Sequence, residues 1–338
     1  MRALVWHGTE RMSVDDVPDP EPGPGEVLLV PEAVGICGSE LEGYLGRQGN
    51  RTPPLVMGHE LAGRIVAAGP GVEDDWVGRH AAVNPLVPPP GAAPGLGHLD
   101  PGRELIGIHR PGGFAGAVRV PEGQLRALPD GADPRLGALA EPLANGVHAS
   151  RLGRAGVEEG PTGRVVVLGA GTIGALALQA ALLDGAEWLG VLELHPGRRE
   201  AAGRLGAHAT FGDDAGLREA LGPHGGADIV LDAVGVDATR RLALELLRPG
   251  GCAVAIGLAH EDTPVAYRDL VRRGLTLRGS YAYTPQDFDR ALEVLLAGEV
   301  GLGPLEDVLP LDAGPGAFAE LASGPSERLK VFLADPGA

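Results

Sequence analysis

The stretch VVVLGAGTIGALALQAALL, residues 165–183, decides the fold of this chain. Its apolar start leads into Gly169, Gly171 and Gly174, which have G-x-G-x-x-G spacing, and an apolar run rich in alanine and leucine follows. The first glycine permits a tight turn, the second lets the backbone approach a pyrophosphate, and the third lets helix and strand pack closely. The pattern predicts a strand, a turn and a helix whose N-terminus binds a dinucleotide.

The same stretch is about as long and apolar as a membrane-spanning helix. Its glycine pattern and its flanking segments favour a strand, a turn and a buried helix instead. The N-terminal residues MRALVWHGTERMSVDD lack the apolar core of a signal peptide. We therefore expect no membrane partner.

An acidic residue downstream supports the dinucleotide interpretation. Glu193 ends the next expected strand, 19 residues after Gly174, close to the spacing of an acid that binds a ribose 2′-hydroxyl. A carboxylate repels a 2′-phosphate, so NAD is favoured, while the nearby Arg198 and Arg199 leave NADP open. A glycine-rich turn packed for structural reasons alone is the alternative. The predicted cofactor-binding residues are Gly169, Gly171, Thr172, Ile173, Gly174, Glu193, Arg198 and Val234.

The chain divides into two kinds of pattern. Its 338 residues exceed the size of a single growing core. Short β segments separated by Pro and Gly predict a mainly β domain over residues 1–147 and 284–338. Over residues 148–283, strand and helix candidates alternate, which predicts a doubly wound parallel sheet of the Rossmann type. We therefore expect an α/β protein in which the cofactor domain is inserted into the β domain.

Composition excludes several function classes. The formal net charge of −17 repels phosphate backbones and anionic lipids, so we expect no nucleic-acid partner. Two cysteines cannot form a disulfide framework, which favours a reducing cytoplasm. The 55 glycines and 30 prolines lie between apolar runs, which is typical of turns rather than of disorder.

Three further segments carry metal-ligand residue types. Cys37 lies in GICGSELEG, His59 and Glu60 lie in VMGHELAG, and Glu141 lies in LAEPLA. A thiolate, an imidazole and a carboxylate are ligands of catalytic zinc, whose fourth position is left to water or substrate. On residue types alone, a buried cysteine, a core histidine and two solvated glutamates explain the segments equally well.

The chain resembles the zinc-dependent medium-chain alcohol dehydrogenases, particularly the sorbitol, threonine and glucose dehydrogenase branch. The resemblance runs nearly end to end and implies a GroES-like catalytic domain beside the Rossmann domain. It is carried by segments that include EVLLVPEAVGICGSE (26–40), GHELAGRIVAAG (58–69), LAEPLA (139–144), VVVLGAGTIG (165–174) and GGCAVAIGL (250–258).

The resemblance implies roles for the catalytic residues. Cys37 and His59 fall on zinc ligands, and Glu60 can approach the metal. Glu141 replaces the second cysteine of classical alcohol dehydrogenases, as in the polyol branch, and implies a labile zinc, often with a water between carboxylate and metal. Ser39 falls on the hydroxyl that receives the substrate's proton. Zinc then supplies a Lewis acid to the substrate oxygen, and the nicotinamide accepts a hydride.

The chain also departs from the family. The lobe that usually holds a structural zinc, residues 86–103, has no cysteine, so we expect one zinc per chain. Glu42 stands where many relatives have a histidine that passes the proton to solvent. Glu40 is expected to support His59 through a hydrogen bond. His109 is a candidate for substrate contact, although a surface or core position is favoured for it.

We therefore expect an NAD-dependent zinc dehydrogenase that acts on a secondary alcohol of a polyol, sugar, cyclitol or hydroxy amino acid. Two alternatives stay open: an NADPH-dependent biosynthetic ketone reductase and a non-catalytic dinucleotide-binding protein. We also expect a homodimer or homotetramer, with residues 275–283 at a subunit contact.

Overall fold

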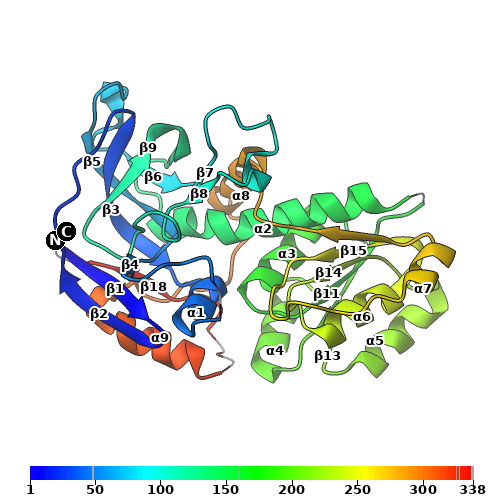
Figure 1. Ribbon diagram of the computed structural model, residues 1–338. Helices are drawn as coiled ribbons and strands as arrows, with labels where there is room; N and C mark the ends of the chain where they lie inside the picture. Colours follow the sequence, from blue (N-terminus) through cyan, green and yellow to red (C-terminus); the bar gives the residue numbers. More distant parts are fainter. Residues whose placement is uncertain (48, 159, 325, 327, 336–338) are drawn as a thin grey trace. The chain divides into compact units, whose positions relative to one another are not determined.

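Two units, each with its own β-sheets, make up the computed structural model, which describes residues 1–335 apart from 48, 159, 325 and 327 (Figure 1). Unit 1 comprises Met1–Glu141, Thr284–Glu299 and Pro304–Ala338. Unit 2 comprises Pro142–Tyr283 and Val300–Gly303. The chain passes from unit 1 to unit 2 at Glu141/Pro142, inside helix α2 (Pro134–Gly156), whereas the sequence pattern placed this change at 147–148.

Unit 2 is built on a six-stranded parallel sheet with the strand order β13-β12-β11-β14-β15-β16. The order reverses beside β11, as in doubly wound dinucleotide-binding folds. The strands are β11 (Arg164–Leu168), β12 (Trp188–Leu192), β13 (Ala209–Phe211), β14 (Ala227–Asp232), β15 (Leu247–Ala255) and β16 (Thr276–Gly279). The helices are α3 (Thr172–Leu183), α4 (Pro196–Arg204), α5 (Asp214–Leu221), α6 (Asp237–Leu246), α7 (Tyr267–Arg272), the 3-10 helix η4 (Gly222–His224) and the second part of α2.

Both faces of this sheet are buried, which explains the unbroken apolar runs of its strands. Val165 and Val167 of β11 pack in one cluster with residues of α2, α3 and α4. Val166 and Leu168 pack in a second cluster with residues of α5 and α6. This alternation follows from the period of two along a strand. The stretch 165–183 therefore forms β11 and α3, and no helix in the described part of the chain is both long and apolar enough to cross a bilayer.

At two positions of the turn after β11, the available space requires a glycine, as the sequence pattern predicted. Gly169 has φ +86°, in the left-handed region, and a Cβ there would lie 2.5 Å from a methyl carbon of Val234. A Cβ on Gly174 would lie 1.9 Å from the carbonyl oxygen of Gly169. Larger residues at either position would push α3 away from the turn, so these glycines set the close approach of helix and strand.

Unit 1 is a set of mainly antiparallel sheets. Its largest sheet has the order β10-β6-β5-β3-β18-β17, with β9 also paired to β3, beside a three-stranded sheet β2-β1-β4 and a two-stranded sheet β7-β8. The strands are β1 (Arg2–Gly8), β2 (Arg11–Asp16), β3 (Glu26–Gly35), β4 (Leu55–Val56), β5 (Glu60–Ala68), β6 (His80–Val83), β7 (Leu86–Val87), β8 (Glu104–Leu105), β9 (Val118–Pro121), β10 (Leu125–Ala127), β17 (Leu309–Pro310) and β18 (Phe332–Ala334). The helices are α1 (Gly38–Tyr44), α8 (Pro285–Leu296), α9 (Gly314–Ala322), η1 (Asp74–Trp76), η2 (Gly97–Leu99), η3 (Glu122–Gln124), η5 (Leu311–Ala313) and the first part of α2.

The pairing of β3 with its two neighbours positions the catalytic segment of unit 1. Gly35, the last residue of β3, pairs with Glu60 of β5 on one side and with Phe332 of β18 on the other. The segment that follows Gly35 is therefore beside the start of β5 and the residues that precede β18. Three parts of the chain that are far apart in sequence meet there.

Candidate active site

The structure brings together three of the four predicted metal ligands. One ligand atom each of Cys37, His59 and Glu60 lies within 4.8 Å of the others. Cys37 directly precedes α1, and His59 and Glu60 stand at the start of β5, so the β3–β5 pairing brings them together. Within the described residues, no other group of three Cys, His, Asp or Glu side chains is this close.

A buried carboxylate holds this group in place. Glu40 of α1 is fully buried, and its Oε2 accepts a hydrogen bond from the backbone N–H of Cys37 at 3.0 Å. Its Oε1 accepts the backbone N–H of Gly58 at 2.7 Å and faces Nδ1 of His59 at 3.0 Å. Because an ionised carboxylate only accepts, Nδ1 carries the hydrogen and Nε2 is left to bind a metal. The support that the sequence predicted for His59 is confirmed.

The electrostatics of the group favour a cation. Burial raises the pKa of Glu40, but His59 and the backbone N–H of Cys37 outweigh burial and lower it below its ordinary value. Burial lowers the pKa of His59, but the negative charges of Glu40 and Cys37 raise it well above the ordinary value. The carboxylate of Glu40, and the thiolate of Cys37 when a metal binds it, would therefore stabilise positive charge beside them. A divalent metal bound by Cys37 and His59 would supply such a charge.

Glu60 is held by a cation from the far end of the chain. Its Oε2 accepts a hydrogen bond from Nζ of Lys330 at 2.5 Å, and Lys330 also donates to the carbonyl oxygen of Ile36 at 3.1 Å. Both side chains are buried. Oε1 of Glu60 is also buried and has no hydrogen-bond partner among the described residues. A buried carboxylate oxygen without a hydrogen-bond partner is suited to bind a metal ion.

Lys330 is the single lysine of the chain, within a total of 28 lysine and arginine residues. Burial lowers its pKa, but the charges of Glu60, Cys37 and Glu141 raise it above the ordinary value. Space at this point is small, because a Cβ on Gly35 would lie 2.1 Å from Oε2 of Glu60 and 3.2 Å from Cδ of Lys330. A compact ammonium fits such a site better than a planar guanidinium.

Glu141, the fourth predicted ligand, does not belong to the group within 4.8 Å. It lies in α2, is buried, and is near enough for its charge to raise the pKa of Lys330. The structure therefore places its carboxylate in the surroundings of the site rather than among the three converging ligand atoms.

Ser39 lies beside Cys37 and also contacts Arg51, a residue that the sequence did not point to. The Ser39 hydroxyl donates to Sγ of Cys37 at 3.5 Å and accepts from Nη2 of Arg51 at 3.3 Å. Glu42, one of the routes by which the proton could reach solvent, lies at the surface and accepts a hydrogen bond from Nη1 of Arg47 at 3.3 Å. Neither Arg51 nor Lys330 belongs to a motif, so no signal in the sequence pointed to them.

The lobe of residues 86–103 does not fit a structural zinc. It contains β7 and η2, and its turns are held by backbone hydrogen bonds such as that from Asp100 N–H to Gly97 C=O at 3.3 Å. A closed zinc site needs four ligands, and the lobe offers His98 and Asp100 as ligand types, with no cysteine.

In unit 2, Glu193 directly follows β12 and contacts the glycine-rich turn. Its Oε2 accepts the backbone N–H of Ala170, and its Oε1 accepts that of His195, each at 2.7 Å. A Cβ on Gly171 would meet Nη1 of Arg198 at 3.8 Å and no closer atom, so the backbone there is open to a ligand. An acid and a guanidinium therefore flank the turn that would bind the pyrophosphate.

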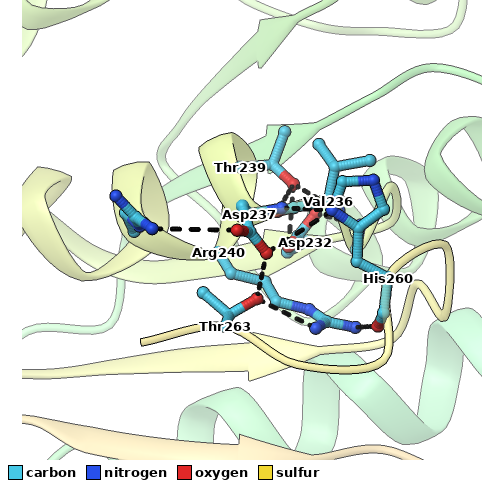
Figure 2. Close-up of polar contacts among 9 residues, drawn as sticks. Asp232, Val236, Asp237, Thr239, Arg240, His260 and Thr263 are labelled. Atoms are coloured by element: carbon cyan, nitrogen blue, oxygen red, sulfur yellow. Dashed lines mark hydrogen bonds and ion pairs between the residues drawn. The ribbon is translucent and has the colours of Figure 1, made fainter. Parts of the chain in front are cut away.

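Hydrogen bonds of Asp232 join the end of β14 to the start of α6 (Figure 2). Asp232 accepts the backbone N–H groups of Val234 and Gly235, each at 3.0 Å, and the hydroxyl of Thr239 at 3.1 Å. Burial raises the pKa of Asp232 above its ordinary value despite these hydrogen bonds. The network fixes the backbone of 232–235 at the carboxyl end of the sheet, where doubly wound folds bind ligands.

A second set of contacts in Figure 2 attaches the loop after β15 to α6. Thr263 donates to Asp237 at 2.7 Å, and Arg240 donates to the hydroxyl of Thr263 at 3.0 Å. Arg240 also donates to the carbonyl oxygen of His260 at 2.5 Å. The loop is thus held beside the predicted cofactor residue Val234.

We predict that Lys330→Met lowers the free energy of unfolding by about 3–5 kcal/mol, because it leaves Glu60 as an uncompensated buried charge. Lys330→Arg is expected to cost about 1–3 kcal/mol through overpacking against Gly35. Denaturant unfolding measures both. Arg204→Met, which removes the cation of the exposed pair with Glu200, serves as the control and should cost less than about 1 kcal/mol. Equal effects at positions 330 and 204 would contradict a buried pair.

Comparisons with known proteins match both parts of the chain. Residues 23–130 match the family described as "Alcohol dehydrogenase GroES-like domain", and residues 172–297 match "Zinc-binding dehydrogenase". The chain is 32% identical to the 2-dehydro-3-deoxy-L-galactonate 5-dehydrogenase of Pseudoalteromonas atlantica, covering 96% of each chain. It is 30% identical to the (R,R)-butanediol dehydrogenase of Bacillus subtilis, covering 84% of this chain and 85% of that one.

Among solved structures, a zinc-binding dehydrogenase of Sinorhizobium meliloti 1021 bound to NADP is similar, with a TM-score of 0.88 and 32% identity over 98% of each chain. The predicted fold class, with a GroES-like domain and a Rossmann sheet, is confirmed. The chain therefore belongs to the zinc-dependent medium-chain alcohol dehydrogenases and is an NAD(P)-dependent zinc dehydrogenase.

Proposed function

We propose that this dehydrogenase binds one zinc per chain and oxidises a secondary alcohol of a polar, polyhydroxylated substrate with NAD. The observation that carries the proposal is the convergence of Cys37, His59 and Glu60 beside the Ser39 hydroxyl. The two relatives described above act, by their names, on a sugar acid and on a diol. Both substrates offer a secondary hydroxyl, which is the group the site would oxidise.

When bound, zinc supplies a Lewis acid for the substrate oxygen and the nicotinamide supplies a hydride acceptor. The protein's own residues orient the metal ligand His59 and accept the proton of the substrate. Glu40 keeps the Nε2 of His59 free for the metal, and Ser39 receives the proton of the substrate hydroxyl. Glu141 would support the metal as a further carboxylate near the three ligands. The role of Glu42 as the outlet to solvent stays a prediction.

Metal content measured together with NAD reduction tests this proposal. Zinc-loaded wild-type protein should hold about one zinc per chain and reduce NAD with members of a panel of polyols, sugars, sugar acids and cyclitols. A chelator should remove zinc and activity together. Cys37→Ser should lose both, with activity falling at least about 100-fold.

Cys252→Ala provides the control, because Cys252 lies fully buried in β15 of unit 2. This variant should keep its zinc and its activity. Wild-type protein that binds no zinc after reconstitution would contradict the proposal and leave a non-catalytic dinucleotide-binding protein. Activity confined to NADPH and ketones would favour the biosynthetic reductase instead.

We infer a preference for NAD from Glu193, whose carboxylate would repel a 2′-phosphate and accept from a 2′-hydroxyl. Arg198 near Gly171 supports the alternative, because a guanidinium attracts a phosphate.

Replacing Glu193 by Ser should therefore raise the kcat/KM ratio of NADP to NAD by about 10- to 100-fold. Glu200→Ser, at an exposed position in α4 of the same unit, should leave the ratio unchanged. Steady-state kinetics with both cofactors measure the ratio. A ratio unmoved by Glu193→Ser would show that the carboxylate does not select the cofactor.

We also propose a homodimer formed through β16, which is an edge strand of the six-stranded sheet. Large apolar side chains are exposed close to it in sequence: Tyr267 is 74% exposed, Val271 72% and Leu277 46%. An exposed strand edge beside an apolar patch favours association with a second copy.

The double variant Val271→Asp/Leu277→Asp should turn the dimer into a monomer, because two charges would be buried at the contact. Light scattering after size-exclusion chromatography measures the mass. Leu96→Asp, at an exposed position of unit 1, is the control and should have the same measured mass as the wild-type protein. A wild-type monomer, or a dimer that persists in the double variant, would contradict this interface.

A further inference from the structure

The buried pair of Glu60 and Lys330 lies within the metal group itself. Glu60 contributes one of the three ligand atoms that lie within 4.8 Å of one another. Nζ of Lys330 donates to Oε2 of Glu60 at 2.5 Å, and the side chains of Lys330 and Glu60 are only 2% and 1% exposed. One of the carboxylates suited to bind a metal is therefore also bound by a cation of the protein.

Two segments of the main chain hold the ammonium in this place. Nζ of Lys330 also donates to the carbonyl oxygen of Ile36 at 3.1 Å, and Ile36 directly precedes Cys37. The backbone N–H of Ile36 in turn donates to the carbonyl oxygen of Val331 at 2.9 Å, so the two segments bind each other. The ammonium is thus fixed next to the ligand Cys37 as well as to Glu60.

The negative charges that act on Lys330 are those that would attract a metal. Burial lowers the pKa of Lys330, but the charges of Glu60, Cys37 and Glu141 raise it above the ordinary value, so the side chain is an ammonium at neutral pH. Cys37 and Glu60 are two of the three converging ligands. The ammonium and a metal ion therefore draw on the same anions.

Two cations on one buried carboxylate weaken each other's binding. Lys330 is bound to Oε2 of Glu60, whereas Oε1 is buried and has no hydrogen-bond partner among the described residues. Oε1 is thus left for a metal, on a carboxylate whose charge is already balanced. Like charges this close repel each other, and burial reduces the screening by salt. The contact therefore stabilises the metal-free site and lowers its affinity for a metal.

We propose that Lys330 is the counter-cation of the metal-free site and that it competes with zinc for the negative charge of Glu60. Zinc is therefore bound exchangeably, unit 1 keeps its fold when zinc leaves, and the activity follows the concentration of free zinc. Lys330 acts through a metal ligand, so it is a positioning residue rather than a catalytic one. This inference rests on the proposed zinc binding and adds a control of zinc occupancy to it.

The affinity for zinc and the rate of zinc release test the inference without any measurement of activity. Competition with a chromophoric chelator gives the affinity, and transfer of zinc to an excess of the chelator gives the rate. Lys330→Gln, which removes the charge and keeps a hydrogen-bond donor, should bind zinc about 10-fold more tightly or better. It should also release zinc about 10-fold more slowly than the wild-type protein.

Two variants are the controls. Lys330→Arg keeps the positive charge, so its affinity for zinc should stay within about 3-fold of the wild-type value. Arg204→Gln makes the same change in net charge as Lys330→Gln, but at an exposed arginine that pairs with Glu200. It should leave both the affinity and the release rate unchanged.

Unfolding of Lys330→Gln with and without zinc gives a second readout. The metal-free variant should be less stable than the metal-free wild-type protein, because Glu60 loses its counter-cation. Zinc should raise the free energy of unfolding more in the variant than in the wild type, because tighter binding to the folded state stabilises it more. If the variant folds only with zinc, the release rate is measured on protein prepared with zinc.

The outcomes separate the inference from the function beneath it. Equal zinc affinity in the wild type and in Lys330→Gln would overturn the inference. Weaker affinity in the variant would overturn it too, because Lys330 would then orient Glu60 for the metal instead of competing with it. The same holds for a variant that zinc does not stabilise. A wild-type protein that binds no zinc would instead overturn the proposed function.

Discussion

The catalytic segment of unit 1 depends on the hydrogen bonds that the Glu40 carboxylate accepts. This carboxylate accepts the backbone N–H groups of Cys37 and Gly58 and the Nδ1–H of His59 while fully buried. One side chain thus joins the start of α1 to the start of β5 and sets the tautomer of the ligand histidine. Because all three partners are donors, the carboxylate remains ionised and keeps negative charge beside the metal group.

Around this carboxylate, the site balances its charges with side chains from distant parts of the chain. Lys330 compensates Glu60, and Arg51 contributes positive charge on the side of Ser39. The ligand group thus has an anionic centre between two buried cations. The negative charge at the centre favours a divalent ion there.

Local patterns in the sequence predicted the parts of the structure that depend on neighbouring residues. The spacing of Gly169 and Gly174 was enough to predict the tight turn and the close packing of α3 on β11. Glu40 lies three residues after Cys37, so its hydrogen bond to the Cys37 backbone is a local contact. Lys330 and Arg51 act through tertiary contacts with no period or motif, and the sequence did not identify them. The change of unit at Glu141/Pro142 falls inside α2, which continues through Pro142, so the sequence shows no break at this point.

The single lysine has a consequence for chemical modification of the protein. Every other basic side chain, apart from the histidines, is an arginine, so the folded chain offers an amine-directed reagent its N-terminus and one shielded ammonium. Acylation of Lys330 requires the Glu60 contact to open, and its rate therefore reports how often this part of the catalytic unit opens. The surface itself carries no lysine at which acetylation or ubiquitination could occur.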